Sequence, residues 1–186
     1  MRVIAITGDI ASGKTTVARF LVKLGEVVFD TDEIGHEIDQ KTPQERRDLA
    51  KKVLADEDLR QALNQQLWPK IKAVLNEKIA LEYAKKTPLV FVQVPRLFET
   101  DWLEQFDEIL LISADEKLRR QRLKERALSP EEIKVRLKLL FDRKNIAVST
   151  KTPLTKLENN GSMRQLEDSV EKYVAKQKDL RSLLLF

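Results

Sequence analysis

The chain has 186 residues, a length that suits one domain with a sizeable hydrophobic core. Its 34 Lys and Arg residues exceed its 30 Asp and Glu residues by four, and outside one stretch the two signs are interleaved, which favours attraction of polyphosphates over binding of nucleic acid. The lack of cysteine excludes disulfides, cysteine nucleophiles and thiolate metal sites. No apolar run approaches the ~20 residues that span a bilayer, and the chain opens on a strand pattern without a charged and apolar leader. We therefore expect a cytoplasmic protein whose partners are small molecules, not nucleic acid or membrane.

The first strong pattern along the chain is a phosphate-binding loop between a strand and a helix. Residues 8–15 read GDIASGKT and match the complete G-x-x-x-x-G-K-[ST] motif. Uncharged residues at 3–6 predict a buried strand before the loop, and the apolar spacing of residues 17–24 predicts a helix after it. Loop amides and the positive end of that helix would hold phosphate oxygens. A chance glycine turn explains the full motif in this context poorly.

The fixed positions of the loop have separate physical roles. Gly8 and Gly13 supply backbone freedom and close approach. Lys14 brings a point charge to the β- and γ-phosphates, and the Thr15 hydroxyl suits Mg²⁺, which takes few protein ligands. The residues expected to bind the nucleotide here are Gly8, Ala11, Ser12, Gly13, Lys14, Thr15 and Thr16.

Two carboxylates follow the second apolar run. Asp30 and Asp32 come directly after the strand expected at residues 27–29. Because phosphoryl transfer depends on positioning and charge, a carboxylate there can accept a hydroxyl proton or hold Mg²⁺ through water. Asp30 suits a helix cap, and for Asp32 a functional role is favoured over a second cap.

Residues 35–86 have a helical, highly charged pattern, with breaks expected near Asp56 and at Trp68-Pro69. The segment is longer than a crossover helix needs. We therefore expect a small helical insertion over the carboxyl ends of the strands, where such sheets bind ligands.

Further apolar runs at residues 89–94 and 109–112 are short and nearly uncharged, which is typical of a buried parallel sheet with helices on both faces. A closing helix is expected over residues 165–186. Capping boxes, in which Glu or Gln follows a hydroxyl residue by three positions, predict four helix starts. They lie at residues 42–45, 113–116, 129–132 and 162–165.

Residues 117–126 carry six basic side chains on one predicted helix, with Arg119, Arg122 and Arg126 on a shared face. We expect Lys117, Arg120 and Lys124 to be solvated. Arg126 is instead predicted to act in a lid over the nucleotide, since guanidinium groups match phosphate oxygens.

At this point the chain resembles the dephospho-coenzyme A kinases, a family of P-loop kinases, over most of its length. The resemblance includes Arg46 in an insertion-helix pattern and five ordered segments. These are the loop at 7–16, DTDEIGHE at 30–37, PRLFE at 95–99, the lid sequence at 122–132 and NNGS at 159–162.

The resemblance implies an α/β P-loop kinase fold: a five-stranded parallel sheet flanked by helices, with residues 154–158 as its last strand. Residues 1–186 would form a single domain with an acceptor-binding insertion at about 35–86 and a helical lid at about 116–150. The implied reaction transfers the γ-phosphoryl group of ATP to the ribose 3′-hydroxyl of dephospho-coenzyme A.

The same resemblance implies residue roles. Asp32 would be the base, Lys14 with the lid residues Arg126 and Arg136 would neutralise phosphate charge, and Thr15 would hold Mg²⁺. Asn159 and Gly161 would lie near adenine. The residues implied at the acceptor are Asp32, His36, Arg46, Pro95 and Phe98. For His36 an ordinary helix surface, and for Phe98 an ordinary core position, stay open as alternatives.

The chain departs from the family pattern at five positions. Asp9 and Ala11 stand where the loop usually has glycine, and the Asp9 charge requires a side chain that points away from the phosphates. Gln93 replaces a common acid, Trp68 a common histidine, and Leu140 a common glutamine. Two other functions therefore stay open: a nucleoside or deoxynucleoside monophosphate kinase, and a catalytically inactive ATP-binding regulatory protein.

Overall fold

The computed structural model describes residues 1–126, 128–138 and 151–183. The chain forms two compact units: the first joins Met1–Phe29 to Lys86–Phe186, and the second is Asp30–Lys85. The first unit holds the sheet and the phosphate loop, and the second consists of helices.

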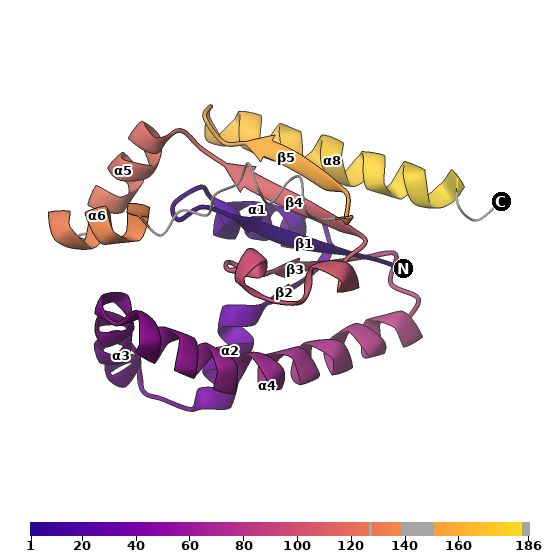
Figure 1. Ribbon diagram of the computed structural model, residues 1–186. Helices are drawn as coiled ribbons and strands as arrows, with labels where there is room; N and C mark the ends of the chain where they lie inside the picture. Colours follow the sequence, from indigo (N-terminus) through magenta and orange to yellow (C-terminus); the bar gives the residue numbers. More distant parts are fainter. Residues whose placement is uncertain (127, 139–150, 184–186) are drawn as a thin grey trace. The chain divides into compact units, whose positions relative to one another are not determined.

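The first unit is built on the predicted five-stranded sheet, whose spatial order is β2-β3-β1-β4-β5 (Figure 1). Its strands are β1 (Arg2–Gly8), β2 (Val27–Asp30), β3 (Leu89–Gln93), β4 (Glu108–Ser113) and β5 (Leu154–Glu158). β1 pairs in parallel with both β3 and β4, and β4 pairs in parallel with β5. The loop follows the last residue of β1 and therefore begins at the carboxyl edge of the sheet, formed by the carboxyl ends of its strands, where parallel sheets bind ligands. Because β1 is the central strand, the loop lies in the middle of this edge.

Apolar helix faces cover this sheet. The described helices of the unit are α1 (Lys14–Lys23), α5 (Glu116–Lys124), α6 (Pro130–Lys138) and α8 (Met163–Leu183), with short 3₁₀ turns η1 (Leu97–Glu99) and η2 (Leu103–Gln105). Val17 and Leu21 of α1 share one buried core with Val170 and Val174 of α8 and with the central strands. The predicted closing helix is thus confirmed as α8, and the predictions for residues 184–186 lie outside the described residues.

The amino edge of the sheet holds a buried polar cluster around Glu108, the first residue of β4. Its carboxylate accepts hydrogen bonds from Thr155 Oγ1 at 2.7 Å, Tyr173 Oη at 2.8 Å and Gln177 Nε2 at 2.8 Å. Arg2 Nη2 completes the set at 3.1 Å. Burial, followed by the charge of Glu108, raises the pKa of Tyr173, so its hydroxyl remains a proton donor. These bonds join α8 to β1, β4 and β5.

The second unit contains α2 (Thr31–Asp39), α3 (Pro43–Ala55) and α4 (Glu57–Ala84). The predicted break near Asp56 is confirmed, because the Asp56 carboxylate caps α4 by accepting from Leu59 N at 2.9 Å. The predicted break at Trp68-Pro69 is wrong, because α4 continues through Pro69. Proline removes the bond to the carbonyl four residues back and crowds that carbonyl, but the buried Ile71 and Leu75 that follow stabilise the helix beyond it.

Three of the four predicted capping boxes are confirmed by reciprocal hydrogen bonds, at residues 42–45, 129–132 and 162–165. The fourth prediction, at Ser113, is wrong. Ser113 is the last residue of β4 and lies in register with Glu158 of β5, so the sheet holds it and α5 begins later, with Asp115 at its N-cap.

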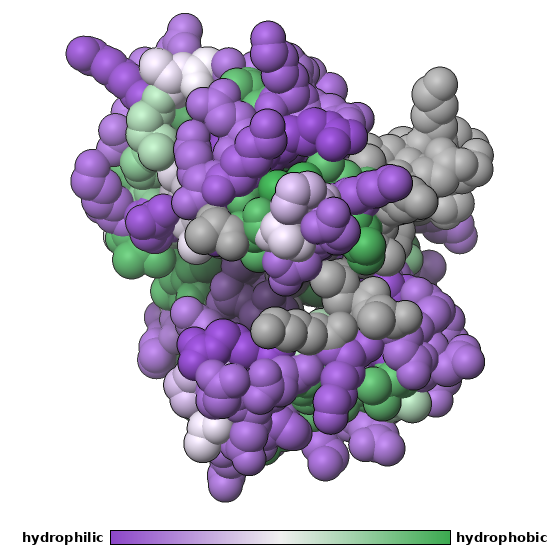
Figure 2. All heavy atoms as spheres, turned by 90° about the vertical axis from the view of Figure 1, so that its left-hand side faces the viewer, coloured by the Kyte–Doolittle hydropathy of each residue, from purple (hydrophilic) through white to green (hydrophobic). Residues whose placement is uncertain are grey.

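Hydrophilic side chains predominate on the face drawn in Figure 2, with smaller hydrophobic areas between them. This agrees with α3, whose described side chains are all exposed or partly exposed. No helix in the described ranges combines the length and the apolar character needed to cross a membrane.

Candidate active site

The phosphate loop lies between β1 and α1, as predicted, and its two glycines adopt backbone conformations that other residues rarely take. Gly8 has φ +145° and Gly13, the N-cap of α1, has φ +105°. A Cβ atom at Gly8 would overlap the carbonyl oxygen of Ile112, and one at Gly13 would overlap the side-chain amide of Asn159. Both glycines therefore permit close packing as well as the turn itself.

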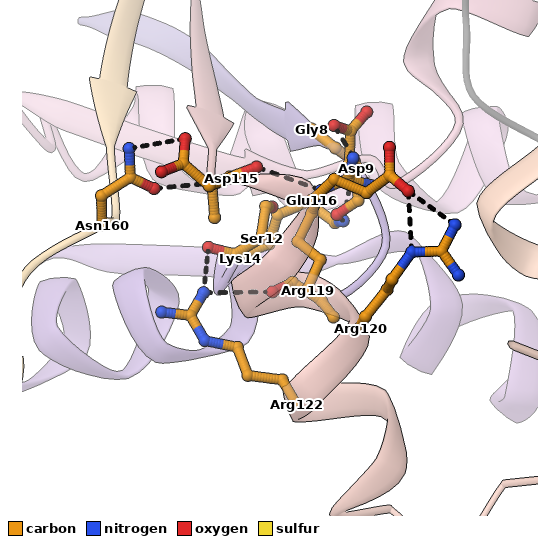
Figure 3. Close-up of polar contacts among 12 residues, drawn as sticks. Gly8, Asp9, Ser12, Lys14, Asp115, Glu116, Arg119, Arg120, Arg122 and Asn160 are labelled. Atoms are coloured by element: carbon orange, nitrogen blue, oxygen red, sulfur yellow. Dashed lines mark hydrogen bonds and ion pairs between the residues drawn. The ribbon is translucent and has the colours of Figure 1, made fainter.

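Lys14 is folded back over the loop. Its Nζ atom donates to the carbonyl oxygens of Gly8 and Asp9, each at 2.8 Å (Figure 3). These two acceptors hold the ammonium group beside the loop. Phosphate oxygens are stronger acceptors than carbonyls because they are charged, so a bound triphosphate would compete for this cation.

The rest of the loop exposes donors at the start of α1. Thr15 is exposed, and the first turn of α1 contains no acidic residue, so nothing on that turn offsets the positive end of its dipole. Ser12 Oγ is buried and makes no hydrogen bond to any residue that the structure describes. The backbone N–H of Thr16, by contrast, already donates to Gly13 O at 3.0 Å. The exposed Thr15 and the positive end of α1 are the features that suit an anion.

A hollow of about 390 Å³ lies beside the loop, and several of the predicted residues line it. It is lined by Ala11, Gly13, Thr16, Arg122, Glu125, Arg126, Asn159, Gly161 and Met163. Asn159 is fixed at this place because its Nδ2 donates to Ser12 O at 2.7 Å. The predicted loop residues, Asn159, Gly161 and Arg126 are thus brought together within the first unit.

Arg122, for which the sequence predicts no role of its own, contacts the loop directly (Figure 3). Its guanidinium donates to the carbonyl oxygens of Ala11 at 3.2 Å, Ser12 at 3.4 Å and Asn159 at 3.0 Å. The available signal was its helical spacing from Arg119 and Arg126, which placed all three on one face.

The two predicted lid arginines lie in different settings. The predicted helix over residues 117–126 is confirmed as far as Lys124, where α5 ends, and Arg126 is exposed in the turn that follows. The Arg126 amide instead bonds to Leu123 O, three residues back, which tightens the chain into a turn. Arg136 is partly buried on α6, and its Nε has no hydrogen-bond partner among the described residues. The part of the predicted lid at residues 139–150 lies outside the described residues.

The two unusual loop residues both contact α5. Asp9 is buried, and its Oδ2 lies 3.5 Å from Nη1 of Arg119. Ala11 adopts the left-handed conformation, with φ +59°, and packs in a small apolar cluster with Leu123 and with residues of α6. Lys117, Arg120 and Lys124 are exposed, as predicted.

The second unit carries the predicted carboxylates. Asp30 caps α2, since its Oδ1 accepts from Asp32 N at 2.8 Å, which confirms the cap prediction. Burial raises the pKa of the Asp30 carboxyl. Asp32 is exposed in the first turn of α2, and His36 is exposed one turn later. Arg46 is partly buried on α3.

Pro95 and Phe98 lie where the chain leaves β3 for the η1 turn, and both are partly exposed. The turn is fixed by buried Leu97 and by an ion pair between Arg96 and Glu99. Gln93, the last residue of β3, is buried.

No group of three or more histidine and acidic side chains suited to a metal ion occurs in the part of the chain that the structure describes. Mg²⁺ keeps most of its waters and is commonly held by one or two protein ligands and substrate phosphates. The exposed Thr15 hydroxyl therefore fits such an ion without a dedicated cluster.

Comparison with known proteins adds independent findings. The sequence model of a family described as Dephospho-CoA kinase matches residues 2–45 and 35–165. A dephospho-CoA kinase of Chlamydia abortus is 30% identical over 195 residues, which cover 91% of this chain and 93% of that protein.

Two solved structures show the shared fold. A crystal structure from Thermus thermophilus matches with a TM-score of 0.74 at 29% identity and covers 94% of this chain and 97% of its own. A shikimate kinase from Acinetobacter baumannii matches with a TM-score of 0.60 at 16% identity, covering 96% and 95%. The predicted α/β P-loop kinase fold is thereby confirmed.

Proposed function

Because this chain belongs to the dephospho-CoA kinase family, we propose that it transfers the γ-phosphoryl group of ATP to the ribose 3′-hydroxyl of dephospho-coenzyme A. The observation that carries the proposal is the phosphate loop at the carboxyl end of β1 in a chain that the family model matches over most of its length. The acceptor is a small molecule, and the lack of cysteine suits a reducing compartment such as the cytoplasm.

The donor side of the reaction belongs to the first unit. Loop amides would hold the β-phosphate, and Lys14 would exchange the carbonyls of Gly8 and Asp9 for phosphate oxygens. Arg126 and Arg136 would neutralise charge that develops on the transferred group. The base and ribose would occupy the hollow beside Asn159 and Gly161. When bound with the nucleotide, Mg²⁺ held by Thr15 would supply further charge neutralisation.

The acceptor side depends on Asp32. Its carboxylate is exposed in the first turn of α2, directly after the cap formed by Asp30. We assign it the role of accepting the hydroxyl proton as the oxygen attacks phosphorus. The further acceptor contacts proposed are those of His36, Arg46, Pro95 and Phe98.

The first experiment measures ADP release from ATP with one acceptor at a time. We expect turnover with dephospho-coenzyme A, a product heavier by one phosphate, and no turnover with an analogue that lacks the 3′-hydroxyl. Turnover with AMP, CMP or deoxynucleotides alone would instead identify a nucleoside monophosphate kinase. ATP binding without turnover on any acceptor would identify an inactive binder.

The second experiment tests the two principal residues with matched controls. Lys14→Ala is expected to lower kcat/KM about 10²- to 10³-fold, whereas Lys23→Ala, at an exposed position of the same helix, stays within about twofold. Asp32→Asn is expected to lower kcat about 10²- to 10⁴-fold, whereas the adjacent exposed Glu33→Gln does not. An unchanged rate for Asp32→Asn would contradict the assignment of the base.

A further inference from the structure

A buried ion pair connects the root of the phosphate loop to α5. Asp9 and Arg119 have side chains that are each only 6% exposed, and the distance between Asp9 Oδ2 and Arg119 Nη1 is 3.5 Å. Arg119 Nε also donates to Ala114 O at 3.0 Å. Asp9 is the residue that stands where related loops usually have glycine, so a buried negative charge has been placed next to a site for anions.

The ion pair between Asp9 and Arg119 is not expected to add much to the stability of the fold. Both charges lose their hydration, and replacing a buried ion pair by apolar groups is often neutral or stabilising. Burial lowers the pKa of Arg119, which indicates that its charged form is held at a cost in solvation. The separation of 3.5 Å exceeds that of a well-formed charge-assisted hydrogen bond.

The consequence of removing the Arg119 charge follows from the neighbours of Asp9. Lys14 Nζ already donates to the Asp9 carbonyl at 2.8 Å, and Ser12 N donates to the same oxygen at 3.2 Å. Without the Arg119 charge, the Asp9 carboxylate beside these groups would attract the Lys14 ammonium and repel phosphate more strongly. Its charge would therefore act directly on nucleotide binding.

The same helix makes a second contact one turn later. Arg122 donates to Ala11 O and Ser12 O, and Leu123 packs in the apolar cluster that contains Ala11. Figure 3 shows Arg119 and Arg122 on the side of α5 that faces the loop, whereas Arg120 pairs with Glu116 away from it. α5 thus contacts the loop at Asp9, Ala11 and Ser12.

We propose that Arg119 is a positioning residue for nucleotide binding: it cancels the charge of Asp9 so that the loop accepts a triphosphate and Lys14 remains available to it. The proposal rests on the proposed function only in requiring that the loop bind ATP. It makes Arg119 and Asp9 an interdependent pair, in which the arginine is required because the carboxylate is present.

The test compares Arg119→Gln, Asp9→Asn and the double variant with the wild-type chain. Arg120→Gln is the matched control, since it removes one exposed arginine from the same helix. ATP binding is measured by calorimetry with ATP alone, and KM is then measured for ATP and for dephospho-coenzyme A separately.

We expect Arg119→Gln to weaken ATP binding about 10- to 100-fold, because a less neutralised carboxylate beside the phosphates, in a site that water screens only partly, repels them with an energy of this order. KM for dephospho-coenzyme A should change less than threefold. The double variant should recover ATP binding to within about threefold of wild type, and Arg120→Gln should stay within twofold. A purely structural pair would not give this selective loss and rescue.

Two results would overturn the proposal. In the first, Arg119→Gln binds ATP with the same affinity as the control Arg120→Gln. In the second, the double variant binds ATP as weakly as Arg119→Gln. Arg119→Lys keeps the charge and guards against a folding defect in the single variant. It should retain ATP binding within about threefold, and a tenfold loss would also contradict the proposal. A wild-type chain that binds no ATP would overturn the proposed function itself, so the two failures are distinguishable.

Discussion

The two edges of the sheet each bury a carboxylate beside an arginine, but the two carboxylates lie in different surroundings. At the amino edge Glu108 accepts four hydrogen bonds, from Arg2, Thr155, Tyr173 and Gln177. At the carboxyl edge Asp9 faces Arg119 across 3.5 Å.

The difference corresponds to what each edge does. A fully hydrogen-bonded carboxylate fixes α8 to the strands and has no capacity left for a ligand. At the carboxyl edge Lys14 rests on two carbonyl oxygens, and Ser12 Oγ is buried without a hydrogen bond to the described residues. Lys14 and Ser12 are therefore polar groups at the carboxyl edge that a bound nucleotide could engage, whereas the Glu108 cluster holds the fold together.

Glu108→Gln tests the polar cluster at the amino edge and should have the largest effect. This change keeps the shape of the side chain but removes the charge and turns one acceptor into a donor that faces other donors. We expect the free energy of unfolding, measured by urea denaturation, to fall by about 3 kcal/mol. The exposed Glu104→Gln should change it by less than about 0.5 kcal/mol.

If the amino edge serves only the fold, kcat and both KM values of folded Glu108→Gln should stay within about twofold of wild type. A large loss of activity with unchanged stability would show instead that this edge communicates with the nucleotide site.

The carboxyl edge is tested by Gly8→Ala. Gly25 also has positive φ, but the space around it is open, whereas a Cβ at Gly8 would overlap Ile112 O. Gly25→Ala should therefore cost about 1 kcal/mol of unfolding free energy from backbone strain, and Gly8→Ala at least about 2 kcal/mol, because β1 must also move away from β4. Equal costs would mean that the close approach at Gly8 is unimportant.

Most of this carboxyl edge could be predicted because its signals are local in sequence. Eight consecutive residues define the loop, and the cap at Asp30 and the capping box at residues 42–45 depend on positions two or three apart. The short apolar runs likewise marked four strands, because a strand buried on both faces has few charges.

The parts that could not be predicted depend on contacts between distant residues. Asp9 and Arg119 are 110 positions apart, as are Ser12 and Arg122, and no spacing rule links them. Charged residues in a basic run are usually solvated, so the burial of Arg119 could only be found from the packing of α5. The predicted break at Trp68-Pro69 was wrong for the opposite reason. The local rule that proline interrupts a helix was overridden by the apolar contacts of α4.

Tyr173→Phe also tests the amino edge and should lower the free energy of unfolding by less than Glu108→Gln does. Removing the hydroxyl deletes one bond to buried Glu108, so we expect a loss of about 1–2 kcal/mol at neutral pH, measured by denaturation.

The pH dependence has a definite sign. The pKa of Tyr173 is raised in the folded chain, so above about pH 10 the unfolded chain loses this proton first and the stability contributed by the hydroxyl declines. The advantage of wild type over Tyr173→Phe should therefore shrink as pH rises through this range. An advantage that grew instead would mean that the phenol is not held as a donor to Glu108.

The smallest expected effect concerns Ala11, the loop residue whose left-handed backbone suits glycine. Ala11→Gly relieves about 1 kcal/mol of strain but loses a buried methyl group that packs near Leu123 and adds freedom to the unfolded chain. The terms nearly cancel, so we expect a change within about 1 kcal/mol. Ala5→Gly, in the extended and fully buried β1, has the same losses without the relief and should cost about 1 kcal/mol more. Equal costs at the two positions would show that the left-handed conformation of Ala11 stores no strain, and that the loop accepts alanine as readily as glycine.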